Sequence, residues 1–451
     1  MQNDYPLQLI SFEICNLYGL YTHEVKFENS NIIILHGRNG VGKTALLKAI
    51  VCTFNGDFPS LIKIPFNKIN ALLNDGSTLT ITKSEISGGV NLRAFLDSKV
   101  KTSYKLDVEL VKNNKKIVSY TYDDIKNKSY NLIENNPWIV QVDNGRYLDR
   151  RTGAQFNADI FDDENFEIHS SAKKIKSKGI LLNHIRRVKV HLVETNRLFS
   201  HTMKNSLMKS DENEQITLSV NKCAKQLTLQ ISKSLKNYGE TSQALDQSFP
   251  HRFINAPTPS MSLNDLKNRL QLLSQKIYIL QEQGILDSRS LQPFDTESLD
   301  NVEHNKLEIM NLYVNDSEEK LKTFDELSNK VKLLLESLNN KFSHKKIALS
   351  KDKGLIVYGQ DDIEIELDDL SSGEQHEIVL LFELLFKVQS GTLVLIDEPE
   401  LSLHVSWQKV FLPELISISD NVGFKSILAT HSPFIVGDRF DLMIALDSED
   451  K

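Results

Sequence analysis

Eight residues near the amino terminus, GRNGVGKT (37–44), have the composition and spacing of a loop that binds nucleotide phosphates. The loop follows the apolar run NIIIL and precedes TALLKAIVCTF, which is the strand–loop–helix context that this motif requires. Glycines let successive backbone N–H groups turn toward one anion at the positive end of a helix. We expect Lys43 to bridge the β- and γ-phosphates of ATP and Thr44 to ligate Mg²⁺. The predicted nucleotide contacts in this loop are Gly37, Asn39, Gly40, Gly42, Lys43 and Thr44.

An acidic motif much later in the chain, LVLIDEPE (393–400), supplies the groups that ATP hydrolysis would need. Asp397 is predicted to hold Mg²⁺ through water, and Glu398 to act as the general base on the attacking water. His431, in ATHSP, ends another apolar run, where it could hydrogen-bond a γ-phosphate. Each feature alone is also consistent with an ordinary strand end or surface residue. Their occurrence together with the phosphate loop predicts an ATPase.

A third polar motif, LSSGEQ (370–375), lies directly before the apolar run IVLLFELLF. Ser371, Ser372 and Gly373 form a small-residue turn at a predicted helix N-terminus, which favours anion binding, with Glu374 beside it. One γ-phosphate is not easily held by this turn and by the phosphate loop within one chain. We therefore predict a head-to-tail dimer that encloses two ATP molecules. The same residues also fit an ordinary capping box between Ser371 and Glu374, and the two interpretations are compatible.

The sequences that flank these motifs predict an α/β fold. Residues 1 to about 125 are rich in β-branched and aromatic residues and contain several alternating apolar and polar runs, as half-buried strands do. After residue 346, TLVLIDE and FKSILATH are short apolar strands that suit a buried parallel sheet, with helical sequences around them. The predicted fold has mixed and parallel sheets with flanking helices and is split by a helical insertion.

The predicted insertion is poor in glycine and contains two heptad seams. The first seam comprises Leu263, Leu266, Leu270, Leu273, Ile277 and Leu280, with Gly284 placed to end the helix and Ser262 or Asn264 placed to cap it. The second seam comprises Met310, Val314, Leu321, Phe324, Val331, Leu335, Leu338 and Phe342. These seams predict an antiparallel coiled-coil hairpin, with a plain helical subdomain as the alternative.

Three segments follow from these patterns. Residues 1–199 are predicted to form the first part of the ATPase head, with the phosphate loop. Residues 200–345 are predicted to form the helical coiled-coil insertion. Residues 346–451 are predicted to complete the head with LSSGEQ, Asp397, Glu398 and His431.

Composition limits the classes of partner. The net charge of −7 argues against a protein that coats nucleic acid over its whole surface. Three widely spaced cysteines without a CxxC pair suit a reducing compartment. No stretch approaches the ~20 apolar residues of a membrane span, and no signal-peptide pattern begins the chain. We therefore predict a cytoplasmic location and no membrane partner. A basic cluster remains a candidate DNA track or a solvated loop, and it comprises Lys173, Lys174, Lys176, Lys178, Arg186 and Arg187.

Taken together, GRNGVGKT, LSSGEQ, LVLIDEPELSLH and ATHSP resemble the motifs of ABC-type ATPases of the RecF/SMC/OLD group. PELSLHVSWQ, VHLVETNRL and SFPHRF are most similar to the OLD-related branch. The resemblance implies an ATPase head that dimerises around ATP, with Leu401 to His404 crossing the interface. It also implies a Mg²⁺-sensing glutamine between the lobes. Asn196 in VETNRL stands at the best candidate position, and its shorter side chain puts that metal role in doubt.

OLD-branch relatives carry a Toprim nuclease after the histidine strand, whereas only FDLMIALDSEDK follows ATHSPFIVGDR here. The layout is similar to stand-alone ATPases of bacterial anti-phage defence, such as the PtuA subunit of Septu with its HNH partner and the ATPase of the PARIS system with its Toprim partner. The resemblance therefore implies a nuclease partner in trans, of HNH or Toprim type. The predicted helical arms separately suggest an oligomer beyond the dimer.

Other functions remain open from the sequence. A RecF- or SMC-like repair or recombination ATPase would bind duplex DNA across the closed dimer. A slowly hydrolysing, ATP-clamped assembly scaffold is a non-enzymatic alternative. A transporter ATPase subunit ranks last because the insertion between the lobes is too long for that class.

Overall fold

The structure is a computed structural model of the chain. It describes residues 6–28, 30–86, 103–123, 139–143, 146–149, 155–157, 168–193, 199–200, 217–255, 262–287 and 304–446. The chain divides into two compact units. Unit 1 comprises Met1–Glu194, Val388–Leu401 and Gln408–Lys451, and unit 2 comprises Thr195–Lys387 and Ser402–Trp407. The segment 346–387, which contains LSSGEQ, thus groups with the helical residues before it, and the three-segment division stays a prediction.

Unit 1 contains an antiparallel sheet of six strands in the order β2-β1-β4-β5-β6-β7. Alternate residues are buried along β4 and β7, because successive side chains of a strand point to opposite faces. The predicted N-terminal strands are therefore confirmed, and β4 is an addition. The strands are β1 (Leu9–Leu17), β2 (Tyr21–Lys26), β4 (Lys68–Leu73), β5 (Ser77–Ile86), β6 (Ser103–Lys112) and β7 (Lys115–Asp123).

A second sheet of unit 1 is parallel and has five strands in the order β11-β17-β18-β3-β19. Its central strands are almost wholly buried, as expected for a parallel sheet covered on both faces. It brings residues from the start and end of the chain side by side in one sheet. The strands are β3 (Ile32–His36), β11 (Val190–Val193), β17 (Leu393–Asp397), β18 (Lys425–Ala429) and β19 (Met443–Ala445).

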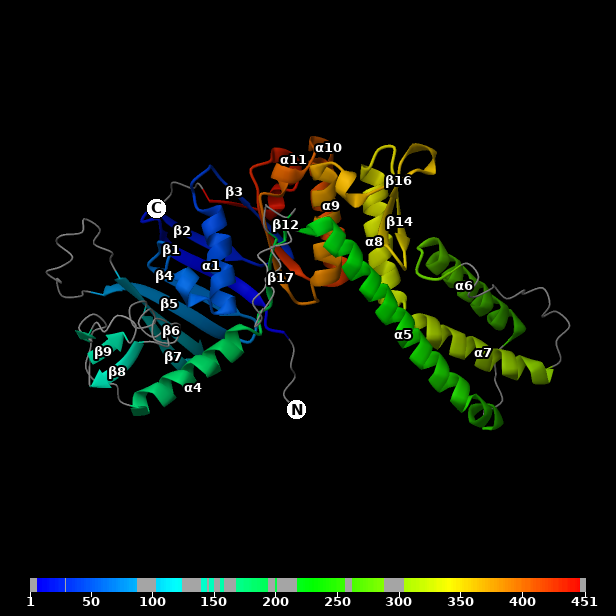
Figure 1. The fold of residues 1–451 in the computed structure, drawn as a ribbon, viewed down its shortest axis with the longest axis horizontal. Helices are drawn as coiled ribbons and strands as arrows, with labels where there is room; N and C mark the ends of the chain where they lie inside the picture. The colour runs from blue at the N-terminus through cyan, green and yellow to red at the C-terminus, as the bar shows by residue number, and fades with distance from the viewer. Residues whose placement is uncertain are drawn as a thin grey trace. The chain divides into compact units, whose positions relative to one another are not determined.

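Helix α1 (Lys43–Asn55) shares one apolar core with both sheets (Figure 1). Ile33 and Leu35 of β3, two positions apart, lie in this core, as do alternate residues of β17 and β18. The helix ends at Gly56, which has a φ of 69°, as a left-handed C-cap requires. This packing fixes the start of α1, and hence the phosphate loop, at the carboxyl end of β3.

The remaining described elements of unit 1 are short, apart from two helices. The helix α10 begins in unit 2 and continues through unit 1. These elements are α2 (Phe58–Leu61), β8 (Ile139–Asp143), β9 (Arg146–Asp149), β10 (Gln155–Asn157), α4 (Ile168–Ile185), η6 (Pro399–Ser402), α10 (Val405–Val422), α11 (Pro433–Val436) and η7 (Phe440–Leu442).

Unit 2 is built mainly from helices, with a three-stranded antiparallel sheet β14-β15-β16. Its longest helix, α5, has 36 residues and was not singled out by the heptad analysis. The elements are β12 (Phe199–Ser200), β13 (Thr217–Leu218), α5 (Ser219–Ile254), α6 (Leu263–Glu282), α7 (His304–Lys322), α8 (Asp325–Lys341), β14 (Lys346–Ser350), β15 (Gly354–Tyr358), η3 (Gln360–Asp362), β16 (Glu364–Ile365), η4 (Leu367–Asp369), α9 (Ser372–Phe382) and η5 (Glu383–Lys387).

The antiparallel partner of α7 is α5 (Figure 1). Arg252 of α5 makes a bidentate ion pair with Asp316 of α7, at 2.5 and 2.7 Å. Asp246, earlier in α5, accepts a hydrogen bond from Lys320, later in α7, at 2.8 Å. Residue numbers therefore rise along one helix as they fall along the other, which defines an antiparallel pair.

The prediction that α6 and the following helix run antiparallel is wrong. Arg269 of α6 donates to Asn311 at 3.2 Å and to Glu318 at 2.6 Å, and Gln283 donates to the Ser328 carbonyl at 3.1 Å. Residue numbers rise together along both helices, so α6 and α7 are parallel. A heptad seam shows which face is buried and not the direction of the partner. For two consecutive helices to run parallel, the connection must return along the length of the first helix. The 16 residues between Asp287 and His304 can span about 50 Å, which is more than the ~30 Å length of α6, so this connection is long enough.

The second predicted seam is also not one continuous helix. Helix α7 ends at Lys322, and the Thr323 hydroxyl donates to the Lys320 carbonyl at 2.8 Å, a side-chain bond that competes with helix continuation. In α8 the buried face includes Leu334 rather than Leu335, which is half-buried. By contrast, the capping of α6 by Ser262 and its termination before Gly284, with a φ of 70°, are confirmed.

The fold class is confirmed: an α/β protein with antiparallel and parallel sheets, interrupted by a helical insertion. None of the described helices combines the length and apolar character needed to span a membrane.

Candidate functional site

The phosphate loop has the backbone geometry that its glycines predict. Gly40 and Gly42 have φ values of 90° and 98°, a region that residues with a Cβ rarely adopt. Gly42 is the N-cap of α1 and supplies no side chain to the first N–H groups of the helix. Arg38, Asn39 and Gly40 are exposed, whereas Gly37 is buried. The loop therefore presents uncapped helix N–H groups, which suit an anion.

Lys43 lies folded inside this loop and is only 5% exposed. Its ammonium donates to the carbonyls of Gly37 at 2.7 Å and Arg38 at 3.1 Å. The same nitrogen lies 3.5 Å from Nδ1 of His431, at the end of β18. The structure thus brings together residues 388 positions apart in the chain.

Thr44, in the first turn of α1, lies beside Asp397 at the carboxyl end of β17. The Thr44 hydroxyl donates to Oδ1 of Asp397 at 3.2 Å. Burial raises the pKa of the Asp397 carboxyl above its usual value, while the Thr44 hydrogen bond and the charge of Lys48 oppose that rise. The Thr44 hydroxyl and the Asp397 carboxylate are hard oxygen ligands that lie side by side. Burial disfavours the charge of the carboxylate, and a small divalent cation bound there would stabilise that charge.

Glu398 has a φ of 44°, a strained conformation for a residue with a Cβ. Its N–H donates to the carbonyl of Ala429 at 2.8 Å, which ties β17 to the end of β18. Oε1 of Glu398 lies 3.7 Å from Nε2 of His431. Strain of about 1–3 kcal/mol at such a residue persists where the surroundings hold it, often at functional sites. Glu398, the predicted general base, and His431, the predicted γ-phosphate contact, are thus neighbours.

A comparison with protein-family models identifies the chain, because residues 8–436 match the AAA ATPase domain. This match covers most of the 451 residues. The chain belongs to the AAA ATPase domain family. Membership supports ATPase activity in general terms.

The ATPase domain is also similar to solved structures of SMC heads. One is the Smc head domain from Pyrococcus furiosus with an extended coiled coil, bound to the C-terminal domain of ScpA, at 12% identity, 97% and 93% coverage of the two chains, and a TM-score of 0.36. Another is the SMC head domain from Thermotoga maritima, at 12% identity, 97% and 94% coverage, and a TM-score of 0.33. At these TM-scores the comparison adds no argument to the family assignment.

The structure of the ATPase domain adds a residue that the sequence analysis missed. Tyr18 lies in the turn between β1 and β2, with a φ of 56° and an exposed fraction of 48%. A Cβ added at Gly42 would lie 2.5 Å from Cδ2 of Leu17 and 3.4 Å from Cε2 of Tyr18. The turn therefore packs on the phosphate loop and presents a flat aromatic ring beside it. No short motif marks such a residue, because the contact depends on how β1 packs against α1.

The LSSGEQ segment of the ATPase domain lies in unit 2, where it forms the capping box that its sequence allows. The Glu374 N–H donates to Oγ of Ser371 at 3.4 Å, and the Ser371 N–H donates to Oε2 of Glu374 at 2.9 Å. Lys345 binds both Glu374 oxygens, at 2.7 and 2.8 Å. Burial would raise the pKa of Glu374, but the hydrogen bonds from Lys345 and Ser371 hold it below its usual value.

The turn before α9 is held by Gln375, whose amide donates to the carbonyls of Leu367, Asp368 and Leu370 at 3.1–3.2 Å. Ser371 and Ser372 remain exposed, and Gly373 is half-exposed. Gln375 and Glu374 therefore fix the turn from inside, and the two serines face outward. The assignment of Ser371, Ser372, Gly373 and Glu374 to nucleotide binding stays a prediction.

Two other sequence predictions are not tested by the structure. Asn196 lies outside the described residues. Leu401, the first residue of the predicted interface loop, is 67% exposed in η6.

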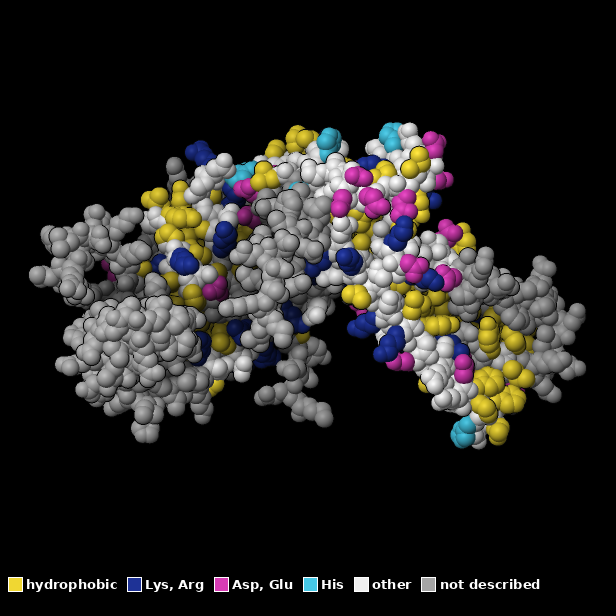
Figure 2. Space-filling model, viewed as in Figure 1, with side chains coloured by type: hydrophobic (Ala, Val, Ile, Leu, Met, Phe, Trp, Pro, Cys, Tyr) yellow, Lys and Arg dark blue, Asp and Glu magenta, His cyan; other side chains and the backbone are white. Residues whose placement is uncertain are grey.

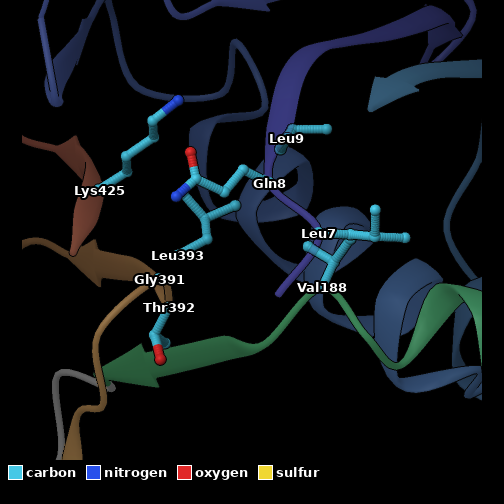
Figure 3. Close-up of a pocket in the computed structure, with 8 residues that line it drawn as sticks. All are labelled: Leu7, Gln8, Leu9, Val188, Gly391, Thr392, Leu393 and Lys425. Atoms are coloured by element: carbon cyan, nitrogen blue, oxygen red, sulfur yellow. The ribbon is translucent and has the colours of Figure 1, made fainter. Parts of the chain in front are cut away.

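A small hollow of unit 1 lies at the amino ends of β17 and β18 (Figure 3). The phosphate loop follows the carboxyl end of β3, and these strands are parallel, so the hollow opens on the opposite edge of the sheet. It is therefore not part of the candidate ATP site. It is lined by Leu7, Gln8, Leu9, Val188, Gly391, Thr392, Leu393 and Lys425.

Proposed function

We propose that this chain binds and hydrolyses ATP at the phosphate loop of unit 1, with Mg²⁺ as cofactor. One observation carries the proposal. Lys43, at the start of α1, lies 3.5 Å from His431, while its neighbour Thr44 contacts Asp397 at the end of β17. Three motifs from distant parts of the sequence thus meet around one helix N-terminus, which is the arrangement that phosphoryl transfer needs.

Each residue has a distinct task in this proposal. Backbone N–H groups of the loop and the Lys43 ammonium hold the phosphates and balance their charge. The Glu398 carboxylate accepts the proton of the attacking water, and His431 orients the terminal phosphate by a hydrogen bond. Thr44 and Asp397 would hold Mg²⁺, which neutralises charge that develops on the phosphate oxygens. Within the described part of the chain, no three His, Cys, Asp or Glu side chains form a metal-binding group, so the remaining ligands would be water and nucleotide oxygens.

Tyr18 is proposed to stack on the adenine ring. Replacing Tyr18 with alanine is expected to raise the KM for ATP about tenfold with little change in kcat, because stacking on a base contributes about 1–3 kcal/mol. Tyr18→Phe keeps the ring and should behave as wild type. Leu20→Ala removes an exposed apolar side chain from the same turn and is the matched control. Steady-state kinetics measure these values, and an unchanged KM in Tyr18→Ala would exclude the stacking role.

We further propose that two chains close head to tail, so that the Ser371–Ser372 turn of one faces the nucleotide of the other. The outward exposure of both serines on a turn fixed by Gln375 supports this arrangement. In the closed dimer the small side chains let N–H groups of α9 approach a phosphate. Association through the helices of unit 2 into larger oligomers is part of the same proposal.

Ser371→Arg is expected to weaken ATP-dependent association more than about tenfold, because a long charged side chain then fills the space meant for a phosphate. Loss of the helix cap alone costs about 1 kcal/mol of stability. Ser262→Arg removes a comparable N-cap from α6 and is the matched control. Light scattering with ATP measures association, and thermal unfolding compares the two variants. Equal association of Ser371→Arg and wild type would contradict the head-to-tail dimer.

The biological role that we propose is control of a separate nuclease subunit in anti-phage defence, in the cytoplasm. This role rests on the motif resemblance. Copurification of the products of the native operon tests it: an HNH or Toprim nuclease bound to this chain supports it. The alternative, a RecF- or SMC-like repair ATPase, predicts instead ATPase stimulation by duplex DNA without a nuclease partner.

Two features of the described surface favour the nuclease partner over direct DNA binding. Arg186 of the basic cluster donates to the Asn55 carbonyl at the end of α1, at 3.3 Å, so it has a structural role. Acidic side chains gather over β16 and the start of α9 (Figure 2). They are exposed and directly precede Ser371, where they would repel a DNA backbone: Asp361, Asp362, Glu364, Glu366, Asp368 and Asp369.

A further inference from the structure

The side chain of Glu400 binds the main chain of His431. Its Oε1 accepts a hydrogen bond from the backbone N–H of His431 at 2.6 Å. Glu400 lies in η6, two residues after the general base, whereas His431 follows β18. A charge-assisted bond to a main-chain N–H fixes position more firmly than a neutral one. A hydrogen bond therefore joins η6, which follows Glu398, to the loop that contains His431.

A second connection runs beside this bond through Gln408. The Gln408 amide nitrogen donates to the Glu400 carbonyl at 3.4 Å, and its oxygen accepts from the Ser432 hydroxyl at 2.6 Å. The Ser432 N–H donates to the hydroxyl of Thr430 at 3.0 Å. The bonds form a closed ring from Glu400 through His431 and Ser432 to Gln408 and back. Such a ring limits movement of the histidine loop relative to η6.

The other oxygen of Glu400 argues that stability is not the reason for a hydrogen-bond acceptor side chain at this position. Among the described residues, Oε2 of Glu400 is buried and has no hydrogen-bond partner. A buried polar atom left unsatisfied costs about 1–3 kcal/mol. An apolar side chain would leave no unsatisfied oxygen here, but it could not accept the His431 N–H, so a side chain with an acceptor is better explained by a task at the site.

We propose that Glu400 is a positioning residue that sets the location of His431 for ATP hydrolysis. It acts through the histidine main chain and does not contact the nucleotide. The bond keeps the imidazole 3.5 Å from the Lys43 ammonium and 3.7 Å from the Glu398 carboxylate. The next residue after Glu400 is the exposed Leu401, the first residue of the predicted dimer-interface loop. The hydrogen bond therefore also connects His431 to the start of that loop. The inference rests on the proposed ATPase function and extends it to the last residue of the LVLIDEPE motif, to which the sequence analysis gave no role.

A mutant cycle tests this inference in the full-length chain. Glu400→Ala is expected to lower kcat about tenfold and to change the KM for ATP less than about twofold. Glu400→Gln should recover most of the activity, because its amide oxygen still accepts the N–H. In a His431→Ala background, Glu400→Ala should cause little further loss, since both changes remove the same function. Additive losses, or a fall in kcat for Glu400→Gln as large as for Glu400→Ala, would overturn the proposal.

Hydrogen exchange gives a readout that does not depend on ATPase activity. The amide of His431 should exchange at least about tenfold faster in Glu400→Ala than in wild type, and near the wild-type rate in Glu400→Gln. Asp438→Ala, which removes an exposed carboxylate near the same loop, is the control. If Glu400→Ala does not fold, Glu400→Met keeps the side-chain length without an acceptor and carries the same expectations.

The outcomes separate the two proposals. A wild-type chain without ATPase activity would refute the proposed function, while the exchange rate would still test the bond. An active wild type with an unchanged His431 exchange rate in Glu400→Ala would refute the positioning role alone.

Discussion

Lys43→Ala is expected to abolish measurable ATP binding, raising the Kd at least a hundredfold. Lys43 is 5% exposed, and its ammonium donates to the carbonyls of Gly37 and Arg38. In the nucleotide complex it would exchange these neutral partners for phosphate oxygens, which attract it more strongly. Removing one partner of a buried charge pair costs about 2–5 kcal/mol, and about 1.4 kcal/mol corresponds to a factor of ten.

The experiment needs a control for loss of a positive charge. Lys26→Ala removes an exposed lysine of the same unit that pairs with the nearby Glu28, so its ATP affinity should equal that of wild type. Calorimetric titration with ATP and Mg²⁺ measures both variants, and circular dichroism checks that each is folded. A Kd for Lys43→Ala within threefold of wild type would show that the nucleotide binds elsewhere.

Glu398→Gln is expected to lower kcat about a hundredfold or more while ATP still binds, because a positioned general base contributes about 10²–10⁴-fold to such a step. Glutamine keeps the size of the side chain and the backbone bond to Ala429, but its amide cannot accept a proton. The side chain that lies 3.7 Å from Nε2 of His431 also loses its negative charge. Slow turnover should let the ATP-bound dimer accumulate.

Single-turnover kinetics separate this effect from a change in binding. Asp420→Asn, at an exposed position of α10, changes a carboxylate to an amide far along the chain from the motif and should leave kcat unchanged. Size-exclusion chromatography with ATP should show more dimer for Glu398→Gln than for wild type. Wild-type turnover in Glu398→Gln would mean that another group activates the water.

The phosphate site was predictable from the sequence because its requirements are local. A loop that wraps an anion needs glycines at positive φ and a lysine at the first helical turn, and GRNGVGKT contains both. Asp397 and His431 follow apolar strands of a parallel sheet, whose carboxyl ends lie along one edge. The structure accordingly brings Lys43, Thr44, Asp397, Glu398 and His431 together.

The sequence predicted that unit 2 contains helices with buried apolar faces, but it did not predict the direction in which those helices pack. The spacing of Leu266, Leu270 and Val314 identified residues that do form one buried cluster. The same spacing is satisfied by a parallel or an antiparallel partner, so the direction of α6 relative to α7 was predicted wrongly. Side-chain pairs such as Arg269 with Glu318 favour the observed direction, and they have no signature along a single helix.

The sequence by itself determined that this chain has a phosphate loop, an acidic strand end, a histidine strand end and a helical insertion, because each depends on residues close in the chain. Only the tertiary structure decided that Tyr18 lies beside Gly42, that Glu400 holds His431 and that α5 is the antiparallel partner of α7. Those contacts join residues far apart in sequence. Their geometry depends on how whole elements pack, which no short motif specifies.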